Sequence, residues 1–170
     1  MRFLYLNRTC FNGIYRVNLR DEFNVPMGTK TLVEYPAGYL KSIADFLTDA
    51  QIRVTDFEET IDKAGENDFL YVDPPYTVMH NNNNFIKYNA SLFSWSDQRR
   101  LASSIKRAAR RGASIMISNA DHESIRELYC GFGYHHRVNR SSVLAAGSLH
   151  RCKTTELLIT SYKTKNSERA

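Results

Sequence analysis

The sequence predicts an α/β protein with a ligand site at the carboxyl end of a β-strand. From about Lys41 onward, short apolar runs alternate with helical patterns, which is typical of α/β folds. The apolar run Phe69–Val72 leads directly into Asp73-Pro74-Pro75-Tyr76, and the two prolines must end the strand because neither has an N–H to donate. The first forty residues lack this alternation and interleave basic with aromatic side chains.

The first elements after this segment are two helices and two strands. Apolar residues at helical spacing predict a helix over residues 39–49, and β-branched residues predict a short strand over 52–54. A second helix over 58–64 is expected to end at Gly65. Phe69–Val72 is then expected to be a buried, central strand.

The second half continues the alternation. Ser94 precedes a helical pattern that ends at Gly112, so the serine is expected to cap a helix between them. The remaining expected elements are a buried strand over 113–118, a helix over 121–130, and strands over 134–138 and 155–162.

Composition limits the class of protein. At 170 residues, with 42% hydrophobic and 24% charged residues, the chain is long enough for one domain with a hydrophobic core. The formal net charge of +5 favours a polyanionic partner. The three cysteines are far apart and lack CxxC spacing, which favours a reducing, cytoplasmic compartment. No metal site is expected, since His135 and His136 have no partner at ligand spacing.

The Asp73-Pro74-Pro75-Tyr76 motif suits the binding of a planar base whose exocyclic amine reacts. A carboxylate and a proline carbonyl can accept the two N–H bonds of an amine, while a tyrosine ring stacks on the base. Open α/β sheets bind ligands at the carboxyl ends of their strands. A plain Pro-Pro turn after a strand is the alternative, and the motif alone leaves both interpretations open.

The amino-terminal segment resembles an exposed hairpin. Asn12-Gly13 is a strong turn signal between β-favouring residues, and arginines alternate with aromatic residues around it. Such a hairpin is expected of a nucleic-acid probe, although an ordinary surface hairpin would show the same pattern.

Seven motifs follow one another along nearly the whole chain, from Arg2 to about Tyr162. They are Phe3-Leu4-Tyr5-Leu6-Asn7-Arg8, Phe11-Asn12-Gly13-Ile14-Tyr15-Arg16-Val17-Asn18, Phe23-Asn24-Val25-Pro26-Met27-Gly28, Asp73-Pro74-Pro75-Tyr76, residues 85–93, Ile117-Ser118-Asn119-Ala120-Asp121 and Glu156-Leu157-Leu158-Ile159. Together they resemble the Dam-type (class alpha) DNA adenine-N6 methyltransferase family. The resemblance implies a Rossmann-like methyltransferase sheet and a site-specific enzyme that methylates adenine, with a GATC-like sequence as the default target.

The resemblance also implies roles for the strand-end motif. Family members flip the target adenine out of the duplex, since its amine cannot be reached inside the stack. Asp73 and the carbonyl of Pro74 would then hold the N6 amine, Pro75 would complete the motif, and Tyr76 would stack on the base. By accepting N–H bonds, these oxygens would make the amine nitrogen a better nucleophile toward a sulfonium methyl group.

S-adenosylmethionine is the cofactor that the resemblance implies. Asp56 and Phe57 stand where the family places an acidic or polar residue and an aromatic residue that contact the cofactor's adenine, and Asp73 would border the same ligand. Phe85 and Tyr88 would help to close the base pocket, unless they serve only to pack the loop.

Double-stranded DNA is the implied partner. Arg16 matches the family's base-reading arginine, whose fork fits guanine O6 and N7. Phe11 and Asn12 would be wedged into the gap left by the flipped base, while Ile14 and Pro26 match apolar positions that touch thymine methyl groups.

By this resemblance, residues 1–45 form a target-recognition segment, 46–163 a partial methyltransferase domain, and 164–170 a polar tail. The family's amino-terminal cofactor motifs are missing, since no pair of glycines lies in a strand-to-helix Gly-x-Gly turn. The Gly131-Phe132-Gly133 run has the spacing but follows a helix and precedes a strand, which is the wrong order. We therefore expect the carboxyl-terminal portion of such an enzyme, with an incomplete S-adenosylmethionine pocket and weak cofactor binding. An exposed sheet edge would favour self-association. A separate amino-terminal fragment would be a further partner, and the chain would be active only when that fragment supplies the missing front half.

Two other functions stay open: a non-catalytic DNA-binding remnant, and an N4-cytosine DNA methyltransferase, which the hairpin disfavours. A basic cluster on the helix after Ser94 is a further candidate DNA surface, although its spread around the helix favours a solvated back. It comprises Arg99, Arg100, Lys106, Arg107, Arg110 and Arg111. The resemblance also implies a bacterial or phage protein of the cytoplasm, associated with the nucleoid when bound to DNA.

Overall fold

The computed structural model divides into two compact units, residues 1–53 and residues 54–170. It describes residues 2–18, 20–30, 32–34, 38–79, 93–141, 153–164 and 168–169. The predicted pocket residues Phe85 and Tyr88 lie outside the described residues.

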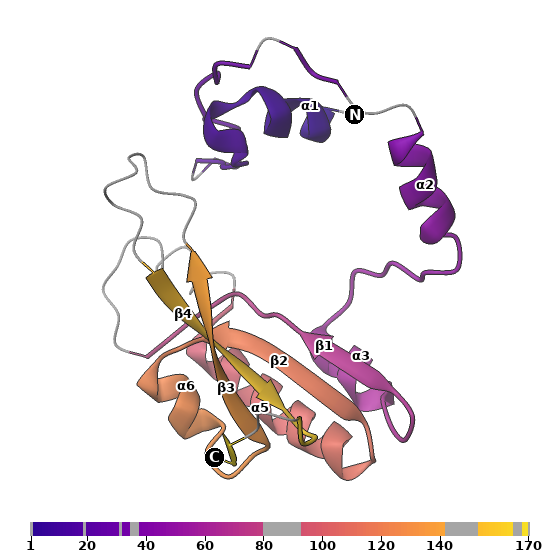
Figure 1. Ribbon diagram of the computed structural model, residues 1–170, viewed down its shortest axis with the longest axis vertical. Helices are drawn as coiled ribbons and strands as arrows, with labels where there is room; N and C mark the ends of the chain where they lie inside the picture. Colours follow the sequence, from indigo (N-terminus) through magenta and orange to yellow (C-terminus); the bar gives the residue numbers. More distant parts are fainter. Residues whose placement is uncertain are drawn as a thin grey trace. The chain divides into compact units, whose positions relative to one another are not determined.

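The carboxyl-terminal unit contains a mixed sheet with the strand order β1-β2-β4-β3-β5. Figure 1 labels its first four strands. The strands are β1 (Phe69–Val72), β2 (Ser114–Ala120), β3 (Tyr134–Ser141), β4 (Lys153–Thr160) and the two-residue β5 (Glu168–Arg169). β1 and β2 run parallel, while β4 is antiparallel to both β2 and β3. The predicted α/β class is therefore confirmed.

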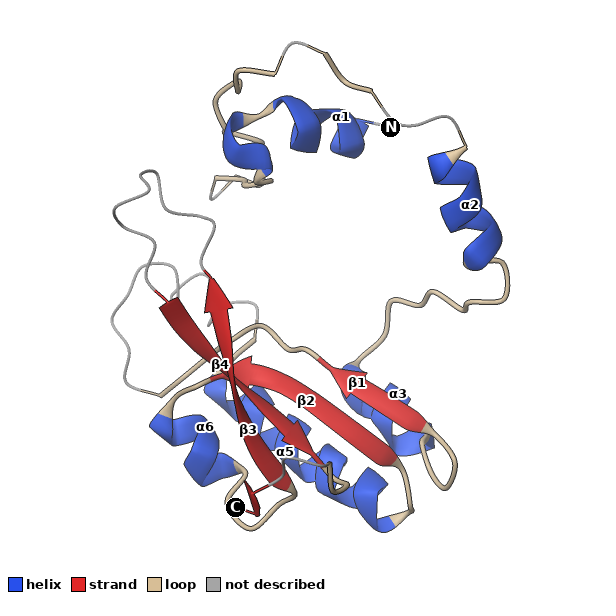
Figure 2. Ribbon diagram, viewed as in Figure 1, coloured by secondary structure: helices blue, strands red, loops and turns tan. Residues whose placement is uncertain are grey.

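Helices pack against one face of this sheet (Figure 2). They are α3 (Phe57–Lys63), α5 (Trp95–Arg110) and α6 (Glu123–Leu128). Alternate side chains of β2 and β4 point to this face, and Ile115, Ile117, Leu157 and Ile159 are fully buried in one cluster with side chains of the three helices. Burial of each such side chain stabilises the fold by about 1.5–3 kcal/mol. The helix layer therefore fixes β2 and β4, and with them the strand ends that carry the candidate site.

Helix α5 begins and ends where the sequence predicts. Ser94 and Asp97 form a capping box, in which each side chain accepts a hydrogen bond from the other residue's backbone N–H. Gly112 follows the helix with a φ of 95°, a left-handed conformation that suits glycine. This pattern places the carboxyl end of α5 directly before β2.

The prediction that Phe69–Val72 is a buried central strand is wrong for the described sheet. β1 pairs only with β2, and Phe69 and Tyr71 are 57% and 60% exposed. The strand predicted over 52–54 is also wrong: these residues are exposed and form no ladder, since no described strand lies beside them. An apolar run predicts that a segment can form a strand, but its neighbours decide whether the strand is buried.

The amino-terminal unit begins with a helix that the sequence did not predict, α1 (Arg2–Thr9). A 3₁₀ turn, η1 (Phe11–Gly13), follows, and α2 (Tyr39–Phe46) confirms the helix predicted there. The rings of Phe3, Tyr15 and Phe23 contact one another in tilted pairs, with centroids 5.1 Å apart for Phe3–Tyr15 and 5.4 Å apart for Tyr15–Phe23, and they form an aromatic cluster in the unit.

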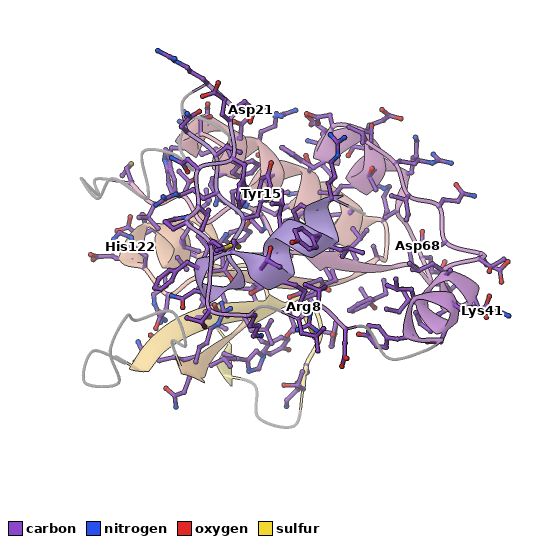
Figure 3. All side chains as sticks on the ribbon, turned by 90° about the horizontal axis from the view of Figure 1, so that it is seen from above. Arg8, Tyr15, Asp21, Lys41, Asp68 and His122 are labelled. Carbon is purple, nitrogen blue, oxygen red and sulfur yellow. The ribbon has the colours of Figure 1, made fainter. Side chains whose placement is uncertain are left out.

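The predicted Asn12-Gly13 turn exists, because both residues have positive φ angles of 57° and 66°, but it does not join two paired strands. Antiparallel bridges instead join Cys10 to Met27 and Val17 to Phe23. The resulting ribbon, whose described residues are 10–18 and 20–27, turns between Asn18 and Glu22, where the side-chain oxygen of Asn18 accepts the N–H bonds of Arg20 and Glu22. Asp21 lies at the outer end of this turn (Figure 3).

No helix in the described part of the chain is long and apolar enough to cross a membrane.

Candidate active site

Asp73 follows β1 on the sheet face opposite the buried helix layer. Tyr71 pairs with Met116 in the parallel ladder, so strand alternation carries Asp73 and Ser118 to the same face. Asp73 is exposed, and within the described residues its carboxylate has no hydrogen-bond or ion-pair partner. A carboxylate at a strand end with unused acceptor positions can accept N–H bonds from a ligand.

The rest of the motif is held against the sheet. Pro74 is buried, while Pro75 is exposed. The hydroxyl of Tyr76 lies 2.8 Å from Oγ of Ser118, and this hydrogen bond ties the ring to the end of β2. Partial burial raises the pKa of the Tyr76 phenol above its ordinary value, while the Ser118 hydrogen bond acts in the opposite direction. The ring therefore stays neutral at physiological pH and is available for stacking.

Two further hydrogen bonds anchor the backbone that leaves the motif. The buried Thr77 donates its hydroxyl to the carbonyl of Phe93 at 2.6 Å, and the N–H of Met79 donates to Oγ of Ser124 at 3.3 Å. These contacts hold the segment after Tyr76 against the start of α5 and against α6. Neither Thr77 nor Ser118 was given a role from the sequence, and only Ser118 lies within one of the quoted motifs.

An ion pair lies on the same face at the same end of the sheet. Glu156 of β4 is paired opposite Ala120 of β2 and Val138 of β3, so alternation brings Glu156 and Arg140 to the face of Ser118. Nη1 of Arg140 donates to Oε1 of Glu156. We call the face that bears Asp73, Ser118, Glu156 and Arg140 the site face.

The two predicted cofactor residues have structural partners. Asp56 caps α3 by accepting the N–H of Glu58, and both of its oxygens accept from Arg100 at 2.9 Å. The Arg100 guanidinium holds the pKa of the Asp56 carboxyl below its usual range. Phe57 packs on Phe93 with ring centroids 5.7 Å apart, and the Arg100 guanidinium also lies over the Phe57 ring, 4.2 Å from its centroid.

The basic cluster on α5 is not simply a solvated surface. Arg100, Arg107 and Arg111 face α3, where Arg107 donates to Glu58 at 2.6 Å and to Asp62 at 2.9 Å. Arg111 donates to two carbonyls at the end of α3 at 2.8 Å. These arginines join α3 to α5, a role that the helical spread of charges did not reveal.

The five predicted DNA-reading residues are all exposed in the amino-terminal unit, whereas the Asp73 group belongs to the other unit. They are Phe11, Asn12, Ile14, Arg16 and Pro26. Nε of Arg16 donates to Oδ1 of Asn24 at 3.2 Å, and no other Arg16 partner occurs among the described residues. The carbonyl of Pro26 accepts the N–H of Phe11 at 2.8 Å and so fixes the 3₁₀ turn against the returning strand of the ribbon.

A hollow of about 460 Å³ lies beside that turn. It is lined by Asn7, Arg8, Cys10, Phe11, Asn12, Gly13, Gly28, Thr29 and Lys30. A Cβ atom at Gly28 would lie 2.7 Å from the carbonyl oxygen of Cys10, so the close approach of the two backbone segments requires glycine.

The described residues contain no group of three or more histidine, cysteine or acidic side chains that could hold a metal ion. Cys10 and Cys130 are free thiols, the first buried and the second exposed.

Comparison with known proteins matches most of the chain to one family. The family model described as D12 class N6 adenine-specific DNA methyltransferase matches residues 1–143. The Type II methyltransferase M1.LlaDCHI of Lactococcus lactis subsp. cremoris is 35% identical over 95% of this chain and 57% of its own length.

Two further relatives are similar. The DNA adenine methylase of Haemophilus influenzae is 35% identical over 92% of this chain and 54% of its own length. The DNA N-6-adenine-methyltransferase of Escherichia phage P1 is 37% identical over 78% of this chain and 18% of its own length. The chain thus spans little more than half the length of the first curated relatives that it matches.

Proposed function

Because the chain belongs to the D12 class N6 adenine-specific DNA methyltransferase family, we propose that its strand-end motif binds the adenine of an N6-methylation site in double-stranded DNA. The observation that supports this best is the Asp73 carboxylate, exposed and without a hydrogen-bond partner among the described residues, beside a tyrosine ring tied to the sheet by Ser118.

The chemistry follows from the two oxygens at the strand end. An extruded adenine presents an amine whose nitrogen lone pair is delocalised into the ring. When the Asp73 carboxylate and the Pro74 carbonyl accept the two N–H bonds, electron density returns to the nitrogen, which becomes a better nucleophile. Both acceptors are preorganised, because the buried Pro74 and its neighbour Pro75 fix the backbone.

Tyr76 supplies the stacking surface in this proposal. Its hydroxyl is held at 2.8 Å by Ser118, so the ring is oriented before the base arrives and loses little freedom on binding. A neutral aromatic face is suited to any base, and selection of adenine then falls to the N–H acceptors beside it.

The family implies S-adenosylmethionine as methyl donor. Asp56 and Phe57, proposed for this ligand, do not fit it as they stand, since Arg100 occupies both Asp56 oxygens and covers the Phe57 ring. Of the three residues proposed to bind S-adenosylmethionine, Asp73 alone has a carboxylate without a partner among the described residues, so it remains a candidate for that role. The reaction steps above depend only on what Asp73, Pro74 and Tyr76 do to the adenine.

We further propose that residues 1–45 are the target-recognition segment, with ribbon 10–27 as its DNA-probing hairpin and a GATC-like site as its target. Arg16 would read guanine with its terminal nitrogens, since its Nε is already bonded to Asn24. Phe11, Asn12, Ile14 and Pro26 are exposed and thus able to meet DNA. Residues 46–163 would form the methyltransferase part, with a Rossmann-like sheet, and 164–170 the tail.

Two properties of the whole chain belong to the same proposal. The cytoplasm is the expected compartment for a DNA-modifying enzyme with free thiols at Cys10 and Cys130. The edge of β1 that pairs with no described strand, together with Phe69 and Tyr71 exposed on the site face, would favour self-association. Sedimentation that shows a concentration-independent monomer would contradict the second property.

The test is methylation of DNA. The purified chain is incubated with S-adenosylmethionine and unmethylated GATC duplex, and the digested nucleosides are analysed by mass spectrometry for N6-methyladenine. Asp73→Asn is expected to lower the rate by roughly 10²–10³-fold, because the carboxylate is lost at the reacting amine. Asp68→Asn is the matched control: it lies at the other end of β1, and its side-chain oxygen still accepts the N–H of Gly65.

The products separate the alternatives. N6-methyladenine that depends on Asp73 supports the proposal. Formation of N4-methylcytosine would favour an N4-cytosine methyltransferase. Binding of the GATC duplex without any methylated base would favour a non-catalytic DNA-binding protein.

A further inference from the structure

A cross-strand ion pair between Arg140 and Glu156 lies on the site face. Arg140 is near the end of β3 and Glu156 near the start of β4, at the same end of the sheet as Asp73. Both side chains point to the site face, and the Arg140 side chain is 64% exposed. We propose that Arg140 pairs with a phosphate of the flipped nucleotide while Asp73 holds its base. This inference rests on the proposed function.

The geometry favours this role because a base cannot enter the site alone. A flipped base stays bonded to its sugar, so the sugar and its phosphate come to the entrance of the site when the base enters. Among the described residues, the ends of β2, β3 and β4 lie beside Asp73 at this end of the sheet, and Arg140 extends from them into solvent. Its planar guanidinium has five N–H donors in a fork that matches phosphate oxygens.

The charges of the site face lead to the same conclusion. Asp73 and Glu156 are two carboxylates close enough to Tyr76 that both contribute to its raised pKa, after the larger effect of burial. A DNA phosphate that comes to this face is repelled by both carboxylates, and the repulsion is little screened at distances shorter than the Debye length of about 8 Å at physiological salt. Arg140 supplies the compensating positive charge at that end of the sheet.

Glu156 explains how the arginine is kept in place before DNA binds. Its side chain is 23% exposed, and its oxygen accepts from Nη1 of Arg140 across the β3–β4 ladder. The pair limits the rotamers of Arg140, which lowers the entropy lost on phosphate binding. Glu156 is therefore a positioning residue in this proposal, and Arg140 is the residue that touches the substrate.

Arg137 provides a matched control. It lies on the same strand, is 62% exposed, and is paired with a carboxylate, Asp121, at 2.8 Å. The two arginines point to opposite faces of the sheet. Arg137 is three residues before Arg140 along β3 and is paired with Leu157, so its side chain lies on the face of the helix layer. Loss of one exposed arginine charge is therefore the same in both variants, and only the position relative to Asp73 differs.

The experiment measures binding of the full chain to a labelled GATC duplex by fluorescence anisotropy over a series of NaCl concentrations. A second duplex carries 2-aminopurine at the target adenine, whose fluorescence rises when the base leaves the stack. Arg140→Gln is expected to weaken binding about tenfold at low salt and to lower the slope of log K against log salt by about 0.9, the value for one phosphate contact. It should also reduce the 2-aminopurine signal, whereas Arg137→Gln should change neither slope nor signal.

Glu156→Gln separates a phosphate contact from a purely structural ion pair. If the pair only supports the β3–β4 ladder, Glu156→Gln and Arg140→Gln break it equally and weaken DNA binding alike, which would overturn the proposal. If Arg140 binds phosphate, Glu156→Gln should keep the wild-type slope of log K against log salt. Arg140→Lys should also show that slope, which Arg140→Gln loses. Thermal melting of each variant identifies any that fails to fold. If Arg140→Gln is one of these, Arg140→Met, which also removes the charge but keeps an apolar stem, replaces it as the test of affinity.

The two proposals can fail separately. Wild-type chain that neither binds GATC duplex nor raises the 2-aminopurine signal contradicts the proposed function and this inference with it. Wild-type binding with equal salt slopes for Arg140→Gln and Arg137→Gln contradicts the phosphate contact alone.

Discussion

Gly133 is expected to be the glycine most sensitive to substitution among those that the structure describes in the carboxyl-terminal unit, and Gly131 in the same turn provides the control. Gly131 and Gly133 both have positive φ angles, of 70° and 67°. A Cβ atom at Gly133 would lie 2.3 Å from the carbonyl oxygen of Thr160, whereas a Cβ atom at Gly131 would meet nothing within 4 Å. Alanine at the two positions therefore shares the backbone strain and differs in the steric clash.

The expected magnitudes follow from these contacts. Alanine in the left-handed region costs about 1–2 kcal/mol, and the stiffer unfolded chain offsets about 0.4–1 kcal/mol of it. Gly131→Ala should thus destabilise the unit by roughly 1 kcal/mol. Gly133→Ala adds an overpacking cost of about 1–3 kcal/mol, because the Thr160 carbonyl belongs to the β4 backbone paired with Tyr134 and cannot move without disturbing the ladder.

Urea denaturation followed by circular dichroism measures both variants against the wild type, at one protein concentration to hold any self-association constant. The midpoint is expected to fall clearly further for Gly133→Ala than for Gly131→Ala, with similar m-values. Equal midpoints for the two variants would refute the reasoning, since the clash with Thr160 would then have no energetic consequence.

Three other perturbations have defined outcomes. Ser118→Ala and Tyr76→Phe each remove the same hydrogen bond, so each should cost about 0.5–1.5 kcal/mol in urea denaturation and the double variant should cost no more than the larger single value. Additive costs would show that the two hydroxyls act independently. Arg107→Gln should lower the urea midpoint at low salt and have a smaller effect in 1 M NaCl, because the ion pairs between α3 and α5 are partly exposed and screened; equal effects at both salts would contradict an electrostatic role. Hydrogen bonds from arginines hold the pKa values of Asp56 and Glu58 below their ordinary values of 3.8 and 4.5. The stability that these two ionised carboxylates add to the fold is therefore complete above their ordinary pKa values and is lost as the pH falls below them. The urea midpoint should thus decrease between about pH 5 and about pH 3. A midpoint that stays constant over this range would contradict the role of these ion pairs.

Local signals in the sequence predicted much of the fold. The Ser94 cap, the Gly112 stop and the apolar stripe between them depend on neighbours within a few residues, and α5 forms where they indicate. The end of β1 at the two prolines is equally local, because proline geometry stops a ladder in any context. Helix α1 was missed, since no capping or stop signal marks it.

Contacts between distant segments could not be predicted in this way. The exposure of β1 depends on which strands lie beside it, and the ribbon 10–27 turns at residues 18–22 because of pairings that the Asn12-Gly13 signal does not specify. The arginines of α5 were read as a solvated surface, because their acidic partners on α3 lie more than forty residues away in the chain.

The sequence by itself determined which groups carry the chemistry: the carboxylate of Asp73, the carbonyl of Pro74 and the ring of Tyr76 are consecutive, and the prolines between them restrict the backbone whatever surrounds it. Only the tertiary structure decided what orients and surrounds these groups. Ser118 and Glu156 reach the same face as Asp73 because strand pairing aligns residues from separate parts of the chain, and alternation then assigns each side chain to one side of the sheet.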